Sequence, residues 1–202
     1  MITFTEAAKK NLRDVVRHEA GHYVVARALK FQVIDLKVSR GAGPRERDVF
    51  DGSAQLVTIQ EDGIVDFQGL ETYLRHRIMV LNAGALAQAF DGTVTDQGRL
   101  REIRKNNAQN DLAKAKELLS LYLNLRIRHG LDRKYMSSDT WEEHPFWLGC
   151  DKEATVIICE NRPAIDRIVV AAERQFMRGD HFHPSAQMLE AIAWDAGAPR
   201  AT

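Results

Sequence analysis

The chain has 202 residues, of which 45% are hydrophobic and 28% are charged, with 28 Lys and Arg against 28 Asp and Glu. These proportions are typical of a soluble globular domain, and the length predicts a single domain over residues 1–202 with a core of its own. The balanced charge argues against nucleic acid and against an anionic membrane surface as partners. We therefore look for function in particular side chains rather than in overall charge.

The N-terminal segment interleaves acids and bases, and no apolar run approaches the ~18 residues of a membrane span. Cys150 and Cys159 do not make a disulfide framework in a chain with an adequate core, and we expect both to be buried small hydrophobes. The sequence therefore favours a cytoplasmic protein without a membrane anchor.

The first part of the chain combines one helix with a small β-element. Apolar residues at helical spacing predict a helix from Asn11 to Leu29. Alternating apolar residues then predict two short strands, over residues 31–39 and 53–59. The residues between them, 41–52, are rich in Gly, Pro and charge, so we expect an exposed loop that is functional or mobile.

The remainder of the chain is predicted to be helical. A helix over residues 70–90 is apolar on nearly all sides and should be central and buried, and Asp91 and Gly92 end it. A polar stretch precedes a further helix over residues 111–129, which Gly130 caps. The fold class is therefore mainly α with a small β-element.

The last third of the chain is predicted as an ordered loop followed by helices. The loop covers residues 131–149, and its aromatic residues Trp141, Phe146 and Trp147 are expected to cover the core. Helix returns over residues 151–178, where Pro163 either starts a second helix or kinks one. A short helix over residues 184–193 is the last predicted element.

The first predicted helix carries the motif H-E-x-x-H at residues 18–22. Histidines at i and i+4 lie on one helix face, so His18 and His22 can bind one metal ion. Glu19 lies about 100° around the helix, where it is poorly placed as a ligand but well placed to accept a proton from bound water. This arrangement predicts the metal site and general base of a metalloprotease.

Chance accounts poorly for this motif, because a chain of this composition would contain roughly 0.016 such matches at random. Gly21 within the motif is also informative. Glycine inside a helix costs about 1 kcal/mol relative to alanine, so we expect another segment to approach it closely.

A catalytic zinc site takes a third protein ligand. Asp111 is the best candidate by pattern, because it begins a stripe of otherwise apolar residues at helical spacing, namely Asp111, Ala115, Leu118, Tyr122 and Leu125. A role as an N-cap or as an acid in the first helical turn is, however, the commoner explanation for such a residue. The remaining histidines stay open as candidates: His76, His129, His144, His181 and His183.

Three segments resemble the peptidase domain of the FtsH-type ATP-dependent zinc metalloproteases, between about Val16 and Arg174. The zinc helix of that family is similar to H-E-A-G-H and the residues after it. Its central helix is similar to G-A-L-A-Q-A-F at 84–90, and its third-ligand segment is similar to N-D-L-A-K-A-K-E-L at 110–118. The resemblance implies a helical, zincin-like domain with Zn²⁺ held by His18, His22 and Asp111. It also implies that Glu19 is catalytic and that an edge strand beside the zinc helix, here near residues 53–59, pairs with the substrate backbone.

The chain departs from that family in features that concern assembly rather than the zinc ligands. It contains no G-x-x-x-x-G-K-[ST] loop, so we expect a stand-alone peptidase without an ATPase module. The charged residues of the family's central helix are replaced by Leu86, Gln88 and Ala89, and its T-T-G-A-like segment by residues 105–109. In the family, these features support a hexameric, membrane-linked machine.

We therefore expect a zinc-dependent endopeptidase that hydrolyses peptide bonds in unfolded or flexible protein segments without ATP. Its partners would be protein or peptide substrates. A separate unfoldase or adaptor protein is a further candidate partner, and the chain could form an oligomer. Two alternatives remain: a catalytically inactive regulatory module that retains the fold, and a zinc hydrolase that acts on a small amide. The intact Glu19 favours the endopeptidase, because nothing structural requires an acid there.

A second group of histidines weighs less than H-E-x-x-H. His181 and His183 form H-x-H after R-G-D, which is more readily explained as an exposed turn leading to Pro184 than as a ligand pair.

Overall fold

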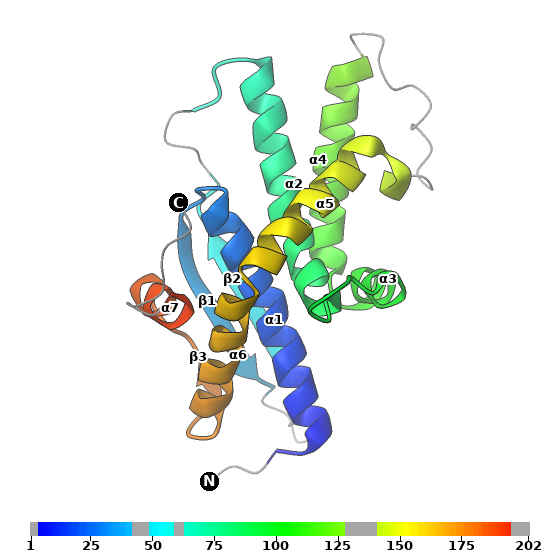
Figure 1. The fold of residues 1–202 in the computed structure, drawn as a ribbon. Helices are drawn as coiled ribbons and strands as arrows, with labels where there is room; N and C mark the ends of the chain where they lie inside the picture. The colour runs from blue at the N-terminus through cyan, green and yellow to red at the C-terminus, as the bar shows by residue number, and fades with distance from the viewer. Residues whose placement is uncertain (1–3, 42–48, 59–62, 128–140, 195–202) are drawn as a thin grey trace.

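The computed structural model describes residues 4–41, 49–58, 63–127 and 141–194 (Figure 1). The elements follow in the order α1 (Glu6–Ala28), β1 (Val33–Arg40), β2 (Phe50–Leu56), α2 (Phe67–Ala89), α3 (Gln97–Asn106), α4 (Gln109–Ile127), a short 3₁₀ helix (Trp141–Glu143), α5 (Pro145–Glu160), α6 (Arg162–Phe176), β3 (His181–Phe182) and α7 (Ala186–Ala193). The described residues are mainly helical with a small antiparallel sheet, which confirms the predicted fold class at that level.

Helix α1 begins at Glu6, five residues before its predicted start, because Thr5 caps it. The Thr5 hydroxyl accepts a hydrogen bond from the backbone N–H of Ala8 and so satisfies a donor that would otherwise lack a partner. Gly21 allows α2 to approach, as its position in the motif predicted. A Cβ atom at Gly21 would lie only 2.6 Å from the carbonyl oxygen of Ala83 and from the Cβ atom of Ala87.

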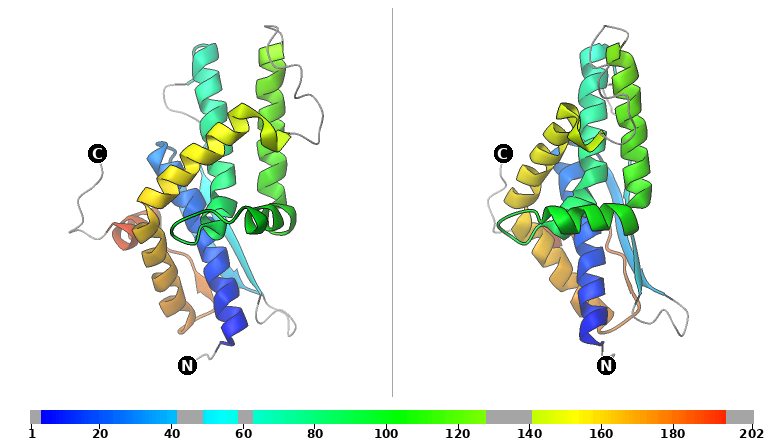
Figure 2. Two further views of the ribbon diagram at one scale, coloured as in Figure 1. Left: turned by 45° about the vertical axis from the view of Figure 1, so that its right-hand side comes forward. Right: turned by 90° about the vertical axis from the view of Figure 1, so that its right-hand side faces the viewer.

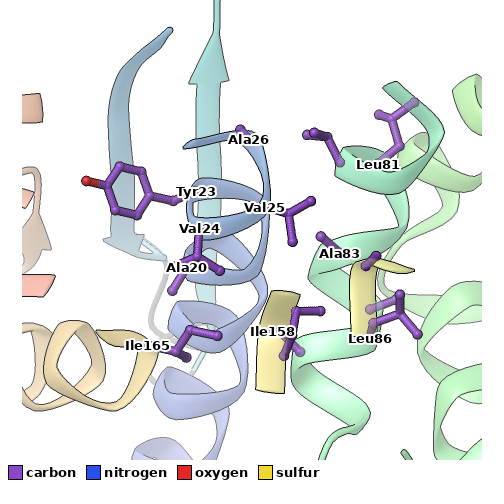
Figure 3. Close-up of a cluster of buried hydrophobic side chains, with 14 of the residues drawn as sticks. Ala20, Tyr23, Val24, Val25, Ala26, Leu81, Ala83, Leu86, Ile158 and Ile165 are labelled. Carbon is purple, nitrogen blue, oxygen red and sulfur yellow. The ribbon is translucent and has the colours of Figure 1, made fainter. Parts of the chain in front are cut away.

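Helix α2 is the central helix, as its apolar composition predicted, and all its residues from Ile78 to Ala89 are buried. It contacts α1, α3, α4 and α5. Figure 3 shows the apolar side chains between these helices, with Ile158 of α5 lying between α1 and α2. Helices α2 and α4 run side by side in both views of Figure 2, so the start of α4 lies close to the packed pair of α1 and α2.

The sheet has the strand order β2-β1-β3, so β2 is an edge strand, and it packs against α1. Strands β1 and β2 are antiparallel, with Leu36 opposite Ala54 and Arg40 opposite Phe50. The sequence therefore predicted the hairpin correctly but started β2 too late. Residues 51–53 are polar or glycine and exposed, so they lack the alternating pattern that marks a half-buried strand.

Parts of the predicted loops and caps lie outside the described residues. These parts are residues 42–48, Ile59, Gly130 and residues 131–140.

Three segments that were predicted as irregular contain regular structure. The polar stretch after α2 contains α3, in which only Leu100, Ile103 and Arg104 are buried and whose first turn is capped by Asp96. Helix α5 begins at Pro145, inside the predicted loop, and the His144 side chain accepts a hydrogen bond from the Phe146 N–H. The segment predicted as an exposed turn forms β3, which pairs with β1.

The break between α5 and α6 falls at Asn161, and Pro163 lies in the first turn of α6, so it starts a second helix. Phe146 and Trp147 are buried in the core, as expected, whereas Trp141 is only half-buried. Both cysteines are unpaired, but only Cys150 is buried. The prediction that Cys159 is buried was wrong, because that position lies on the outer face of α5.

Within the part of the chain that the structure describes, no helix combines the length and the apolar character needed to cross a membrane.

Candidate metal centre

The structure brings His18, His22 and Asp111 together. The Oδ2 atom of Asp111 lies 3.4 Å from Nε2 of His18 and 3.2 Å from Nε2 of His22. One ligand atom from each residue can be chosen so that all three lie within 4.8 Å of one another, and the described residues form no other group of this kind. Both histidines are buried on α1, and Asp111 lies in the first turn of α4. These three side chains could therefore hold a metal ion.

Two residues of α2 fix the orientation of the imidazole rings. Nδ1 of His22 lies 2.7 Å from the backbone oxygen of Val80, which can only accept a hydrogen bond, so Nδ1 carries the proton. Nδ1 of His18 lies 3.3 Å from Oε1 of Gln88, which also accepts. Each ring therefore turns its other nitrogen, Nε2, toward Asp111, as a neutral metal-ligating histidine requires.

Gly84 of α2 leaves space beside these nitrogens. A Cβ atom at this position would lie 2.5 Å from Nε2 of His18 and 2.5 Å from Nε2 of His22. Any other residue would therefore fill the space that a shared ion needs. Two imidazole nitrogens and a carboxylate oxygen around such a space fit a catalytic zinc ion, which takes three protein ligands and leaves a position for water.

The pKa values of His22 and Asp111 suit a site at which a metal ion and a proton compete. Burial alone would lower the pKa of His22, but its hydrogen bond to Asp111 and the charge of that carboxylate raise the pKa to about 9. Burial alone would raise the pKa of Asp111, but His18 and His22 hold it well below its ordinary value. Without a metal, the Asp111 carboxylate therefore favours the protonated form of His22, and a bound cation would compete with that proton.

Glu19 lies beside the group without belonging to it. Its carboxylate faces β2, where the Ala54 backbone makes a hydrogen bond to it and Gly52 gives it room. A Cβ atom at Gly52 would lie 2.7 Å from Oε1 of Glu19. Burial raises the pKa of Glu19, while the positive charges of His22 and His18 partly oppose this effect. A carboxylate held next to a metal site in this way is placed to accept a proton from water.

The three candidate ligands, Glu19, Val80 and Gln88 line one cavity of about 870 Å³. Strand β2 forms one wall along its whole length, and α1, α2 and the start of α4 form the others. A cavity with an edge strand along one wall can accept an extended peptide, because no other strand of the described residues pairs with β2 on that side.

The other candidate histidines do not join this site. His76 is on α2 but does not line the cavity, and His144 caps α5. His181 is exposed in β3, while His183 lies 3.2 Å from a carboxylate oxygen of Asp35. His129 lies outside the described residues.

Sequence reasoning identified the ligand candidates but missed the residues of α2 that support them. Val80, Gly84 and Gln88 lie at i, i+4 and i+8, on the face of α2 that meets α1. This spacing was visible in the sequence, but the helix is apolar on nearly all sides, so no pattern distinguished that face from the rest.

No protein-family model and no curated protein matches this chain.

Proposed function

We propose that this protein is a zinc-dependent endopeptidase whose helical domain is zincin-like, similar to the peptidase domain of the FtsH-type metalloproteases. The observation that carries the proposal is the meeting of Asp111 with both histidines of H-E-x-x-H. A helix-capping role for Asp111 would not require this contact.

His18, His22 and Asp111 would hold Zn²⁺ in this proposal. A bound zinc ion supplies Lewis acidity, which lowers the pKa of water toward 7 and polarises a carbonyl group. Val80 and Gln88 keep the two imidazole rings in the required tautomer. Asp111 contributes the negative charge that makes the site selective for a cation.

Glu19 would act as the general base and then as the general acid. It accepts a proton from the attacking water and passes that proton to the leaving amine as the peptide C–N bond breaks. Its burial raises its pKa toward the working pH, which suits both steps. The hydrogen bond with the Ala54 backbone fixes the carboxylate relative to β2, and therefore relative to a peptide bound along that strand.

Strand β2 would bind the substrate by strand addition. This mode requires backbone N–H and C=O groups that a folded substrate has already paired, so the substrate should be an unfolded or flexible segment. We further propose that the isolated chain needs no ATP, and that stably folded proteins are cut only after a separate unfoldase or adaptor presents them.

The test compares an unfolded protein, casein, with a stable folded protein as substrates of the purified full chain. We expect cleavage of casein that is lost with a chelator, restored by zinc and unaffected by ATP, whereas the folded protein resists. Efficient cleavage of the folded protein, or stimulation by ATP, would contradict the substrate part of the proposal. A zinc-loaded sample that cleaves nothing would favour the inactive regulatory module.

A further inference from the structure

Arg77 is the one charged residue of α2 that lines the cavity. It precedes Val80, the residue that orients His22, by one helical turn. The structure gives its guanidinium no hydrogen bond and no ion pair within the described residues, and its buried Nη1 atom has no partner. Its contact is with the ring of Phe31, whose centroid is 5.8 Å away.

Two other arginines, one on α2 and one on α3, have an ion-pair partner where Arg77 has none among the described residues. Arg75 of α2 pairs with Glu153 at 2.6 Å, and Arg104 of α3 pairs with Asp151 at 2.7 Å. A guanidinium stays protonated and offers five N–H donors, so burial without an anion carries a cost. Burial lowers the pKa of Arg77 below its ordinary value, and Tyr73 and Asp111, neither of which forms an ion pair with it, oppose this effect only in part. The position therefore favours an anion that comes from outside the chain.

The position of Arg77 along the cavity is defined by its neighbours. Tyr73, one turn earlier on α2, donates a hydrogen bond to the backbone oxygen of Thr58, and Thr58 lines the cavity just after β2 ends. The opposite end lies near Asn11, whose side chain accepts from the Phe50 N–H where β2 begins. Arg77 thus lies at the C-terminal end of β2, on the path that a peptide paired with this strand would follow.

We propose that Arg77 binds a carboxylate group of the substrate, so that the cleft selects peptides with an acidic group at this end. The proposal rests on the proposed function, because it treats the cavity as a peptide-binding cleft. Guanidinium and carboxylate match in geometry through two parallel N–H···O bonds, which neutral side chains cannot replace. The carboxylate comes either from an Asp or Glu side chain or from the C-terminus of the peptide.

The test of this role of Arg77 measures peptide binding to the zinc-loaded Glu19→Gln variant of the full chain. This variant lacks the proposed general base, so the peptides are not cleaved during the measurement. The probes are fluorescein-labelled alanine-rich nonapeptides in which one glutamate is moved through each position, each compared with its glutamine equivalent. Every peptide is made with a free and with an amidated C-terminus, which separates the two sources of the carboxylate. Fluorescence polarisation measures the dissociation constants.

We expect at least one glutamate position, or the free C-terminus, to tighten binding by about 10-fold or more. Adding Arg77→Met should remove this preference while leaving binding of the neutral peptides within about twofold, and Arg77→Lys should keep part of it. Arg75→Met is the matched control, because Arg75 lies on the same helix but pairs with Glu153 away from the cavity, and it should keep the full preference. If Arg77→Met does not fold, Arg77→Gln carries the same comparison.

Equal binding of the acidic and neutral peptides, or no binding of either, would overturn the role of Arg77. An equal loss for both kinds of peptide in Arg77→Met would also overturn it and would indicate a general effect on the cleft. Failure of the proposed function looks different: the preference for a carboxylate persists in binding, but zinc-loaded wild-type protein cleaves none of the peptides.

Discussion

Asp111 follows His18 by 93 positions, yet its Oδ2 atom lies 3.4 Å from Nε2 of that histidine. The contact depends on three helices, because α1 carries the histidine, α4 carries the acid, and α2 lies against both. Gly84 of α2 lies beside the imidazole nitrogens, where it leaves room for an ion. The packing of α2 therefore decides whether the three ligands can share a metal.

Gly84→Ala tests this dependence. The added methyl group would lie 2.5 Å from both Nε2 atoms, so we expect zinc affinity to fall by about 10-fold or more, as for other changes beside metal ligands. Competition with a zinc-binding dye measures the affinity. Gly149→Ala in α5 is the control, because a Cβ atom there would meet only the flexible end of Arg75, at 3.3 Å. Unchanged zinc affinity in Gly84→Ala would show that the ion does not occupy this space.

The parts of the site that the sequence predicted are those that a single helix encodes. His18, Glu19 and His22 lie within one turn of α1, so their spacing alone determines which of them share a face. Asp111 was visible only as an acid on an apolar stripe, and the resemblance was needed to prefer a ligand role over a capping role. Val80, Gln88 and Arg77 depend on how α2 crosses the other helices, which no local pattern specifies.

The errors in the fold predicted from the sequence have a similar origin. Helix α3 buries only Leu100, Ile103 and Arg104, so its apolar stripe is too short to detect. Residues 51–53 of β2 are exposed and polar or glycine, and their strand conformation comes from pairing with β1 rather than from their own pattern. By contrast, α1 and α2 bury long faces and were predicted close to their observed bounds.

Asp151 should contribute strongly to stability through a buried network. Its carboxylate accepts hydrogen bonds from Arg104 at 2.7 and 2.8 Å and from Asn82 at 2.8 Å, which joins α2, α3 and α5. Asp151→Ala leaves a buried guanidinium without an anion, so we expect the free energy of unfolding to fall by about 3–5 kcal/mol. Urea denaturation of the metal-free protein measures it.

Glu153→Ala provides the comparison for Asp151→Ala, since it removes the partly exposed pair with Arg75. That change should cost only about 0–1 kcal/mol. Similar losses in the two variants would mean that the Asp151 network is not the stabilising feature described above.

The two cysteines should differ in reactivity. Burial raises the pKa of the Cys150 thiol to about 12, whereas Cys159 is exposed. Because the thiolate is the reactive form, Cys150 should stay unreactive from pH 7 to 9, and only Cys159 should react quickly with a thiol reagent in the folded protein. In denatured protein, both thiols should react with the reagent. Rapid modification of Cys150 in the Cys159→Ser variant at pH 8 would place that residue nearer the surface.

Strand β2 should gain protection from hydrogen exchange when a peptide binds. Zinc-loaded Glu19→Gln protein with a bound casein fragment is compared with the same protein alone, and slower exchange is expected within residues 50–56. Strand β1 is the internal control, because it pairs with β2 along its length and with β3 at Val38 and Ser39, so it should change little. Unchanged exchange in β2 at saturating peptide would leave this edge without a role in substrate binding.

The most direct test of the account measures zinc content and casein cleavage together in wild-type protein and in four variants. We predict one zinc ion per chain in wild type and in Glu19→Gln, with turnover in Glu19→Gln reduced by about 10²-fold or more because the general base is lost. His18→Ala, His22→Ala and Asp111→Ala should lose both zinc and activity. Full zinc occupancy in Asp111→Ala would transfer the third-ligand role to another residue, and wild-type turnover by zinc-loaded Glu19→Gln would contradict the proposed mechanism.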